Sequence, residues 1–308
     1  MKSKKSLEVL CEEIKDSTIF QMIDHLYASH QFSIKVMCRL FQVSRFSYYA
    51  FKSHQPSQRD QENKLLKKEI MISYLASSKR YGAPKIHKDL LEKGYQISEK
   101  RVQKLMTELN IRSIVRKKYR PASLSKQEAK EYPNLLKRDF STDKINQKWV
   151  TDMTYIYTLS DGWCYLSSIL DLHSRKIIAW RLSRQMETRL VIETLQDSLS
   201  TRTVANGLIL HSDRGSQYTS KEYNDYLEHH SIRHSYSAKG CPYDNSCIES
   251  FHATIKKECI YAKTNVGYKD FQTCYNSIFK YIEGFYNSRR RHSKLNYICP
   301  NEFEKQNA

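Results

Sequence analysis

Three consecutive β-type segments constrain the fold of this chain more than any other feature. They are rich in β-branched and aromatic residues and comprise Trp149–Tyr157, Trp163–Leu170 and Lys176–Leu182. Because Ser160-Asp161-Gly162 is a hairpin signal, we expect the first two to pair as antiparallel strands. Helical and strand patterns alternate after them, in the order Thr188–Ser200, Leu208–Leu210, Ser220–His230, Ile232–Ser237 and Asn245–Ile260. Antiparallel strands followed by such alternation predict an α/β domain with a mixed sheet.

Three carboxylates stand where this order of elements could gather them. Asp152 lies in the middle of the first strand, Asp213 lies just beyond the fourth, and Glu249 lies on the last core helix. Magnesium prefers oxygen ligands, and two Mg²⁺ ions roughly 3.5–4 Å apart can activate a nucleophile and stabilise the leaving oxygen of a phosphodiester. We therefore predict that these three residues hold catalytic metal, with Gly215 and Gly240 giving flexible backbone beside them.

Spacing alone does not single out this set, because the chain has 33 acidic residues. Three nearby aspartates, Asp161, Asp171 and Asp244, are alternative candidates for metal ligands. Asp171 ends a strand, where it could orient a loop, and Asp244 stands where a helix cap or turn residue belongs.

The distribution of charge indicates a polyanionic partner. The chain has 51 Lys and Arg against 33 Asp and Glu, for a net charge of +18. Residues 60–120 alone carry a net +9, which is half the excess in about a fifth of the chain. Such clustering favours nucleic-acid binding over a merely soluble basic protein, and the 22 tyrosines add surface for stacking.

Residues 1–55 are predicted to be helical. Apolar residues recur at helical spacing at Ile34, Met37, Leu40 and Phe41. Ser44 can then cap a short second helix that begins at Arg45. A helix-turn-helix and a simple helical hairpin both fit this pattern.

Residues 56–120 are predicted to form a helix-turn-helix-like DNA-binding domain. After an initial helix, Ala83–Glu92 forms a second, which Gly94 can terminate, and Ser98 can cap a third. The apolar face of the third helix comprises Val102, Leu105, Met106 and Leu109. Its opposite face is basic and amide-bearing, and comprises Lys100, Gln103, Lys104 and Thr107. Such a face suits insertion into the major groove of DNA.

The remaining segments are a linker at 121–143, a catalytic core at 144–262 and a C-terminal extension at 263–308. The extension contains an aromatic helix followed by Arg289, Arg290, Arg291 and His292. Basic residues complement a helix C-terminus, but three arginines and a histidine exceed that need, so we expect phosphate contact.

Four motifs carry a family resemblance. They are Trp149-Val150-Thr151-Asp152-Met153-Thr154-Tyr155-Ile156, His211-Ser212-Asp213-Arg214-Gly215-Ser216-Gln217-Tyr218, Pro242-Tyr243-Asp244-Asn245 with Glu249-Ser250-Phe251, and Tyr286-Asn287 with Arg290-Arg291-His292-Ser293. Together they resemble the retroviral-integrase-like bacterial transposases of insertion sequence family three, in particular the product of the second open reading frame, OrfB. The resemblance runs from about residue 35 to the C-terminus, and Arg80-Tyr81-Gly82 through Asn110 resembles the upstream DNA-binding module of the family.

This resemblance implies a ribonuclease-H-like catalytic core with a DD(35)E triad at Asp152, Asp213 and Glu249. It also implies DNA contact by Lys256, seven positions after the glutamate, and a cofactor of two Mg²⁺ ions for which Mn²⁺ can substitute. The implied reaction frees a 3′-hydroxyl at the element's end, which then attacks another phosphodiester. Implied partners are double-stranded DNA at the element ends and target, further copies of the chain, and an upstream OrfA product or a fusion with it. Small departures from the family pattern are Cys241 and His252.

Other functions remain open from the residues. A transposition regulator or inactive remnant predicts a damaged triad, and a metal nuclease would not need the N-terminal helices or the arginine-rich tail. A tyrosine recombinase would need an Arg…His-x-x-Arg…Tyr set, which is not evident. The eight cysteines form no C-x-x-C pair and no apolar run is long enough for a membrane span, so we expect a cytoplasmic, nucleoid-associated protein without membrane contact.

Overall fold

The computed structural model describes residues 16–29, 32–53, 55, 57–114, 132–204, 206–262 and 267–307. It divides into two compact units, Met1–Lys68 and Glu69–Ala308, which are described separately. The end of the predicted DNA-binding domain at 115–120 and the first part of the predicted linker, 121–131, lie outside the described residues.

The first unit contains three short helices around one small core. They are α2 (Asp16–Ala28), α3 (Ile34–Leu40) and α4 (Arg45–Ser53). The core side chains are Ile19, Phe20, Ile23, Met37, Cys38 and Tyr48. As predicted, a helix follows Ser44, whose hydroxyl accepts a hydrogen bond from the Ser47 N–H at 2.9 Å. The three helices pack against one another, so a simple two-helix hairpin does not describe this unit.

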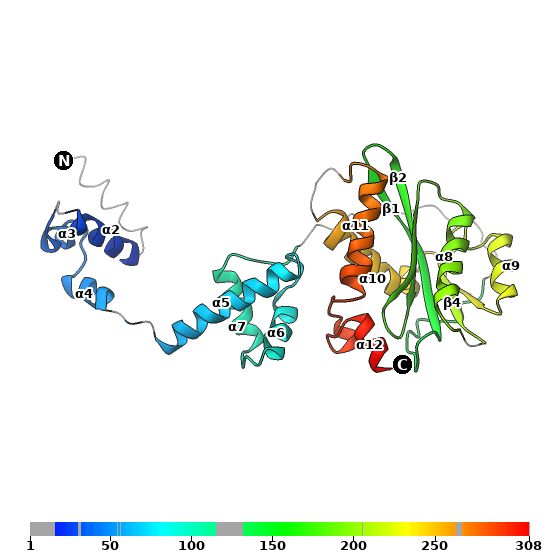
Figure 1. Cartoon of the computed structure of the whole chain (residues 1–308), viewed down its shortest axis with the longest axis horizontal. Coiled ribbons are helices and arrows are strands. Elements are labelled where there is room, and N and C mark those ends of the chain that lie inside the picture. The colour runs from blue at the N-terminus through cyan, green and yellow to red at the C-terminus, as the bar shows by residue number, and fades with distance from the viewer. Residues whose placement is uncertain are drawn as a thin grey trace. The chain divides into compact units, whose positions relative to one another are not determined.

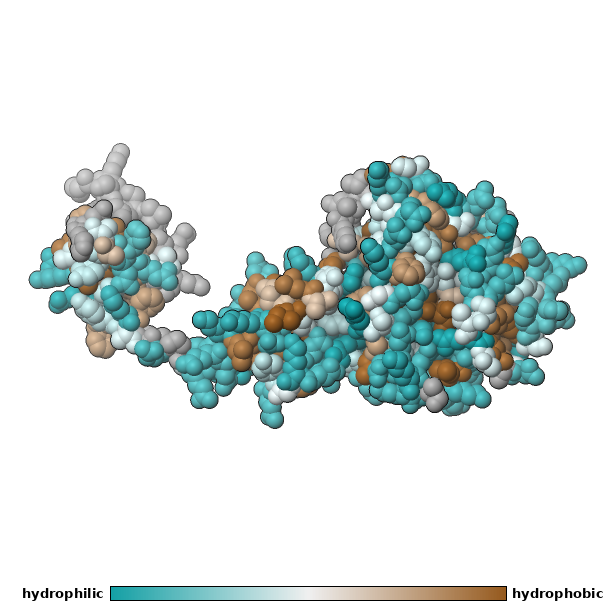
Figure 2. Space-filling view, in the orientation of Figure 1, coloured by the Kyte–Doolittle hydropathy of each residue, from teal (hydrophilic) through white to brown (hydrophobic). Residues whose placement is uncertain are grey.

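Helices α5 (Gln58–Ala76), α6 (Ala83–Glu92) and α7 (Glu99–Glu108) are the three helices that the sequence predicted for residues 56–120. Gly94 adopts a left-handed conformation with φ +86°, and the Ser98 hydroxyl accepts a hydrogen bond from the Arg101 N–H. Both predicted helix boundaries are therefore confirmed. Figure 2 shows that the visible face of the molecule is mainly hydrophilic, with apolar areas between. Large apolar side chains on α5 are exposed, namely Leu65, Ile72 and Leu75.

A five-stranded mixed sheet forms the centre of the second unit, in the order β3-β2-β1-β4-β5. The strands are β1 (Lys148–Thr158), β2 (Gly162–Asp171), β3 (Ile177–Ser183), β4 (Ile209–Ser212) and β5 (Arg233–Tyr236). The pairs β1–β2 and β2–β3 are antiparallel, whereas β4 runs parallel to β1 and to β5. This is the mixed sheet that the pattern of strands and helices predicted.

Helices cover both faces of the sheet (Figure 1). On one face lie α8 (Thr188–Thr201) and α9 (Lys221–His229), and on the other lie α10 (Ser246–Ile255) and α11 (Phe271–Tyr281). The α8 face holds an apolar core in which Trp149 and Leu210 of the sheet pack with Leu195. Burying this face explains why the strands are rich in large apolar and β-branched residues.

The predicted helix Asn245–Ile260 is wrong in detail. The chain instead forms a 3₁₀ turn, η1 (Pro242–Asn245), then α10, then a π-helical turn, η2 (Lys256–Ile260). A second π-helical turn, η3 (Ile282–Tyr286), follows α11, and the chain ends with η4 (Ser293–Leu295) and α12 (Pro300–Gln306). Apolar spacing does not distinguish such a wider helical turn from an α-helix, and within η2 Glu258 is buried and accepts a hydrogen bond from the Tyr281 hydroxyl. No helix among the described residues combines the length and hydrophobicity that a bilayer crossing requires.

Candidate active site

Strand register brings the first two predicted carboxylates together. In the parallel pair β1–β4, Val150 lies opposite His211. Asp152 and Asp213 each lie two residues further along, so both project from the same face at neighbouring positions. Asp152 is in the middle of β1 and Asp213 directly follows β4, as predicted. Helix α10 packs on β1 and carries Glu249 in its first turn, so the third carboxylate approaches from above this face.

The electrostatics of the site agree with this proximity. Burial and the negative charge of Asp152 raise the pKa of Asp213 to about 6, although part of its side chain is exposed. Burial together with the charges of Asp152 and Asp213 raises the pKa of Glu249. The charge of Asp152 therefore destabilises the ionised forms of Asp213 and Glu249, which is the condition that a bound cation relieves.

Backbone contacts hold two of the carboxylates in place. The Met153 N–H donates to Asp152 Oδ1 at 2.8 Å, and the Gly215 N–H donates to Asp213 Oδ1 at 2.9 Å. A Cβ atom at position 215 would stand 3.1 Å from Asp213 Oδ1, so glycine permits this close approach. Gly240, with φ +70°, adopts a left-handed conformation in the loop before η1.

Lys256 lies beside the same group of carboxylates. Burial lowers the pKa of Lys256, and the negative charge of Asp152 opposes this effect. The residue begins η2, directly after α10, so the helix that presents Glu249 also presents this amine.

The donor set fits a divalent cation. Carboxylate oxygens are hard ligands of the kind that Mg²⁺ and Mn²⁺ accept, and the three side chains repel one another without a cation. Among the described residues, no three His, Cys, Asp or Glu side chains already stand in an arrangement that holds a metal ion. Glu249 is exposed, so packing does not hold its side chain away from the other two.

The three rival aspartates have structural roles instead. Asp171 is fully buried and accepts hydrogen bonds from the backbone N–H groups of Asn146, His173 and Ser174. Asp244 accepts from the Ala238 N–H and pairs with Arg138. Asp161 pairs with Arg184 and accepts from the Phe271 N–H. Each carboxylate is thus used to fix a loop, as the sequence suggested for Asp171.

The predicted DNA-binding residues fall into two groups. Lys100, Gln103 and Lys104 are exposed on α7, on the face opposite its buried apolar side chains. Arg289 is also exposed. The remaining members of the basic tail are turned into the protein.

Arg290, Arg291 and His292, for which we expected phosphate contact, have their nearest partners within the protein. Arg290 binds Glu258 through its guanidinium, with contacts of 2.8 and 3.0 Å. Arg291 pairs with Asp89 at 2.6 Å and with Glu92. Burial, together with the positive charges of Arg290 and Lys85, lowers the pKa of His292 to about 2, so its ring is neutral. Carboxylates distant in the sequence neutralise this cluster.

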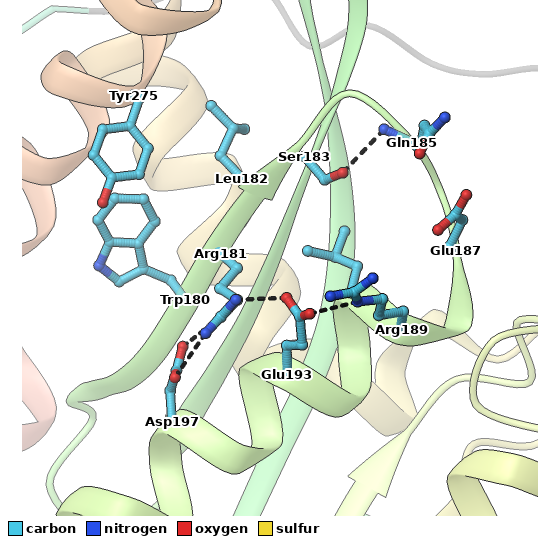
Figure 3. A pocket seen from close by; sticks show the side chains of 11 residues that line it. Trp180, Arg181, Leu182, Ser183, Gln185, Glu187, Arg189, Glu193, Asp197 and Tyr275 are labelled. Atoms are coloured by element: carbon cyan, nitrogen blue, oxygen red, sulfur yellow. Dashed lines mark hydrogen bonds and ion pairs between the residues drawn. The ribbon is translucent and has the colours of Figure 1, made fainter.

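A separate polar pocket lies beside β3 and α8 and includes none of the three carboxylates. Figure 3 shows Arg181 between Asp197 and Glu193, with Arg189 also bound to Glu193. These side chains neutralise one another, and the ion pairs lie between β3 and α8, on the opposite face of the sheet from Asp152.

The raised pKa of Asp213 gives a prediction about stability. A folded-state pKa of about 6 against an ordinary 3.8 means that the metal-free fold loses stability as pH rises through this window. Replacing Asp213 by Asn should therefore raise the Tm of the metal-free protein near pH 7. Solvent screening limits the gain to about 1 kcal/mol, or roughly 2–4 °C. Thermal unfolding near pH 7 and near pH 4 checks it, because the gain should disappear at the lower pH; an equal gain at both would contradict the assignment.

Comparison with known proteins identifies the class and then the family. Residues 142–242 and 230–300 match two families described as "Integrase core domain", and residues 60–119 match the family "HTH-like domain". Fold and domain composition thus define a DNA-transfer enzyme of the integrase class, with a ribonuclease-H-like core. "Transposase InsF for insertion sequence IS3A" of Escherichia coli (strain K12) is 36% identical over 279 residues, covering 90% of this chain and 96% of that protein. The chain belongs to the IS3 family of transposases, which are DDE polynucleotidyl transferases acting in DNA transposition.

Other similar proteins extend the comparison. "Insertion element IS600 uncharacterized 31 kDa protein" of Shigella sonnei is 35% identical over 270 residues, covering 88% of this chain and 98% of that protein. Among solved structures, the HTLV-2 integrase catalytic core domain in complex with magnesium covers 52% of this chain and 97% of its own, with 12% identity and a TM-score of 0.39. The family resemblance predicted from the four motifs is confirmed by the curated relatives.

Proposed function

We propose that Asp152, Asp213 and Glu249 hold two Mg²⁺ ions, which Mn²⁺ can replace, and that they catalyse cleavage and strand transfer at the ends of an insertion sequence. The observation that carries this proposal is the position of Asp152 and Asp213 on one face of the sheet, with Glu249 on the helix that packs there, where the charge of Asp152 raises the pKa of both other carboxylates. The bound ions would supply a deprotonated nucleophile and neutralise charge at the scissile phosphate.

The residues of the chain bind and orient the DNA. Asp152 and Asp213, fixed by backbone hydrogen bonds, define where the scissile phosphate lies. Lys256 contacts a neighbouring phosphate. In the first step a water oxygen bonds to phosphorus and the P–O3′ bond breaks, leaving a free 3′-hydroxyl. In the second step that hydroxyl attacks another phosphodiester, whose own 3′-oxygen leaves.

Element ends and target are both double-stranded DNA, and α7 supplies the groove-reading surface. The exposed, basic face formed by Lys100, Gln103 and Lys104 supports this role, and Arg289 supplies a further phosphate contact. Acting on chromosomal DNA places the protein in the cytoplasm, associated with the nucleoid.

Pairing two ends requires at least two copies of the chain. The exposed apolar side chains of α5, Leu65, Ile72 and Leu75, support helix association between proteins. The upstream OrfA product, free or fused to this chain, is the second partner that we propose.

The decisive experiment incubates the purified protein and Mg²⁺ with the DNA that flanks its own gene. We expect a nick at the element's end and a joined product. Binding without cleavage would favour a regulator, and hydrolysis without joining would favour a simple nuclease.

Lys100→Ala combined with Lys104→Ala is expected to weaken DNA binding and to reduce the slope of log affinity against log salt by about 2. For each lysine–phosphate contact that is removed, about one counterion fewer is released from the DNA on binding. Fluorescence anisotropy across a salt series measures both effects. Lys221→Ala with Lys305→Ala removes two exposed lysines away from α7, on α9 and α12, and serves as the control. A slope equal to that of the control would exclude α7 from the interface.

A further inference from the structure

His252 lies between the carboxylate of Asp152 and the hydroxyl of Ser168. Its Nε2 atom is 2.9 Å from Ser168 Oγ, and its Nδ1 atom is 3.3 Å from Asp152 Oδ2. His252 is only 6% exposed and Ser168 is fully buried. The imidazole is thus enclosed, with one nitrogen toward each partner.

The fold itself creates this row of side chains. Asp152 on β1 is directly opposite Ser168 on β2, so both project from the same face of the sheet. Helix α10 covers that face, and His252 lies three positions after Glu249, on the side of the helix that faces β1. One helix therefore brings a proposed metal ligand to the site and places His252 against another.

When the ring is neutral, only one arrangement of hydrogens satisfies all three groups. An ionised carboxylate accepts hydrogen bonds but cannot donate, whereas a serine hydroxyl can do either. Ser168 therefore donates to Nε2, and the ring carries its hydrogen on Nδ1, directed at Asp152 Oδ2. In the other tautomer the lone pair of Nδ1 would face the carboxylate oxygen and repel it.

We propose that Ser168 and His252 are positioning residues that orient Asp152 for binding metal, an inference that rests on the metal-binding role of Asp152 under the proposed function. Oδ1 of Asp152 is already fixed by the Met153 N–H at 2.8 Å. The contacts that run from Ser168 through His252 to Asp152, called the relay below, restrain Oδ2, so the Asp152 carboxylate does not rotate freely. Partners of this kind typically change metal affinity or activity by about 10- to 100-fold when removed.

The hydrogen arrangement is tested first in the metal-free wild-type protein. The ¹⁵N chemical shifts of the His252 ring, assigned by their loss in His252→Phe, report which nitrogen carries the hydrogen. We expect the Nδ1–H tautomer in the wild type and also in Ser168→Ala, where Asp152 still accepts from Nδ1, with a changed Nε2 shift because the hydrogen bond from Ser168 is lost. A wild-type ring protonated on Nε2 alone would overturn the relay whatever the variants do.

The effect on metal is tested with Mn²⁺ alone, by calorimetry on the protein without DNA. His252→Phe keeps an aromatic ring and removes both nitrogens, and Ser168→Ala removes only the donor. We expect both to weaken Mn²⁺ binding by about 10- to 100-fold. The double variant should bind no worse than His252→Phe, because both changes break one chain of contacts. DNA affinity should not change.

Ser200→Ala, at an exposed site on α8, is the matched control for Ser168→Ala. Wild-type Mn²⁺ affinity in folded His252→Phe and Ser168→Ala would overturn the proposal. Asp152→Asn separates the two levels of inference. If Asp152→Asn abolishes Mn²⁺ binding while His252→Phe and Ser168→Ala do not weaken it, only the positioning role of Ser168 and His252 is refuted. If Asp152→Asn also leaves Mn²⁺ binding intact, the proposed metal site itself is refuted.

Discussion

Replacing Asp213 by Asn is expected to abolish DNA cleavage and strand transfer while leaving DNA binding intact. The amide keeps the size of the side chain but removes the charge beside Asp152 that holds a cation. Loss of several kcal/mol of metal-dependent transition-state stabilisation corresponds to a rate decrease of roughly 10³-fold or more. Single-turnover cleavage of end DNA in Mg²⁺, with anisotropy for binding, measures both properties.

Asp225→Asn is the matched control for this variant. Asp225 is exposed on α9, on the other face of the sheet, and its replacement makes the same change in charge. We expect wild-type cleavage from it. Joining activity in Asp213→Asn comparable to that of Asp225→Asn would refute the metal site, and lost DNA binding would indicate a structural effect instead.

Replacing Arg290 by Met is expected to destabilise the second unit by about 3–5 kcal/mol, since it leaves the carboxylate of Glu258 buried without its cation. In the pair, the side chains of Glu258 and Arg290 are only 9% and 14% exposed. The Tyr281 hydroxyl still donates to Glu258 at 2.8 Å but does not neutralise it. Chemical denaturation at neutral pH measures the change in the free energy of unfolding.

Arg189→Met provides the comparison, because the Arg189–Glu193 pair is at the surface with Arg189 79% exposed. Its loss should change stability by about 0.5 kcal/mol at most. Adding Glu258→Leu to Arg290→Met should recover much of the lost stability, because the Glu258 carboxylate is then no longer buried without Arg290. Similar losses for Arg189→Met and Arg290→Met would contradict the buried pair.

Local patterns made most of the fold predictable. Strands β1 to β5 and the helices between them were predictable from the local pattern of apolar and polar residues and from turn signals such as Ser160-Asp161-Gly162. Both signals depend only on residues close together in the chain. The exposed face of α7 was predictable in the same way, because the spacing of Val102, Leu105 and Met106 identifies the buried face of the helix. The positions of Asp152, Asp213 and Glu249 on their elements were predicted for the same reason.

Contacts between distant segments were not predictable in this way. Three adjacent arginines suggest a phosphate-binding surface until the carboxylates that neutralise Arg291 are known, and these lie about two hundred positions earlier in the chain. The role of Ser168 is likewise visible only once the register of β1 and β2 is fixed. His252 stood out as a departure from the family pattern, but its position between the side chains of Asp152 on β1 and Ser168 on β2 could not be predicted from the sequence.

The C-terminal arginines have one further consequence. Arg291 joins α6 through Asp89 and Glu92, and the Arg80 guanidinium donates to the backbone oxygen of Glu258 at 3.1 Å, a few residues beyond Glu249. These contacts join α6 to the segment that directly follows the helix carrying Glu249. If α7 binds the element end as we propose, the protein itself would fix the distance between the bound sequence and the phosphodiester that is cleaved.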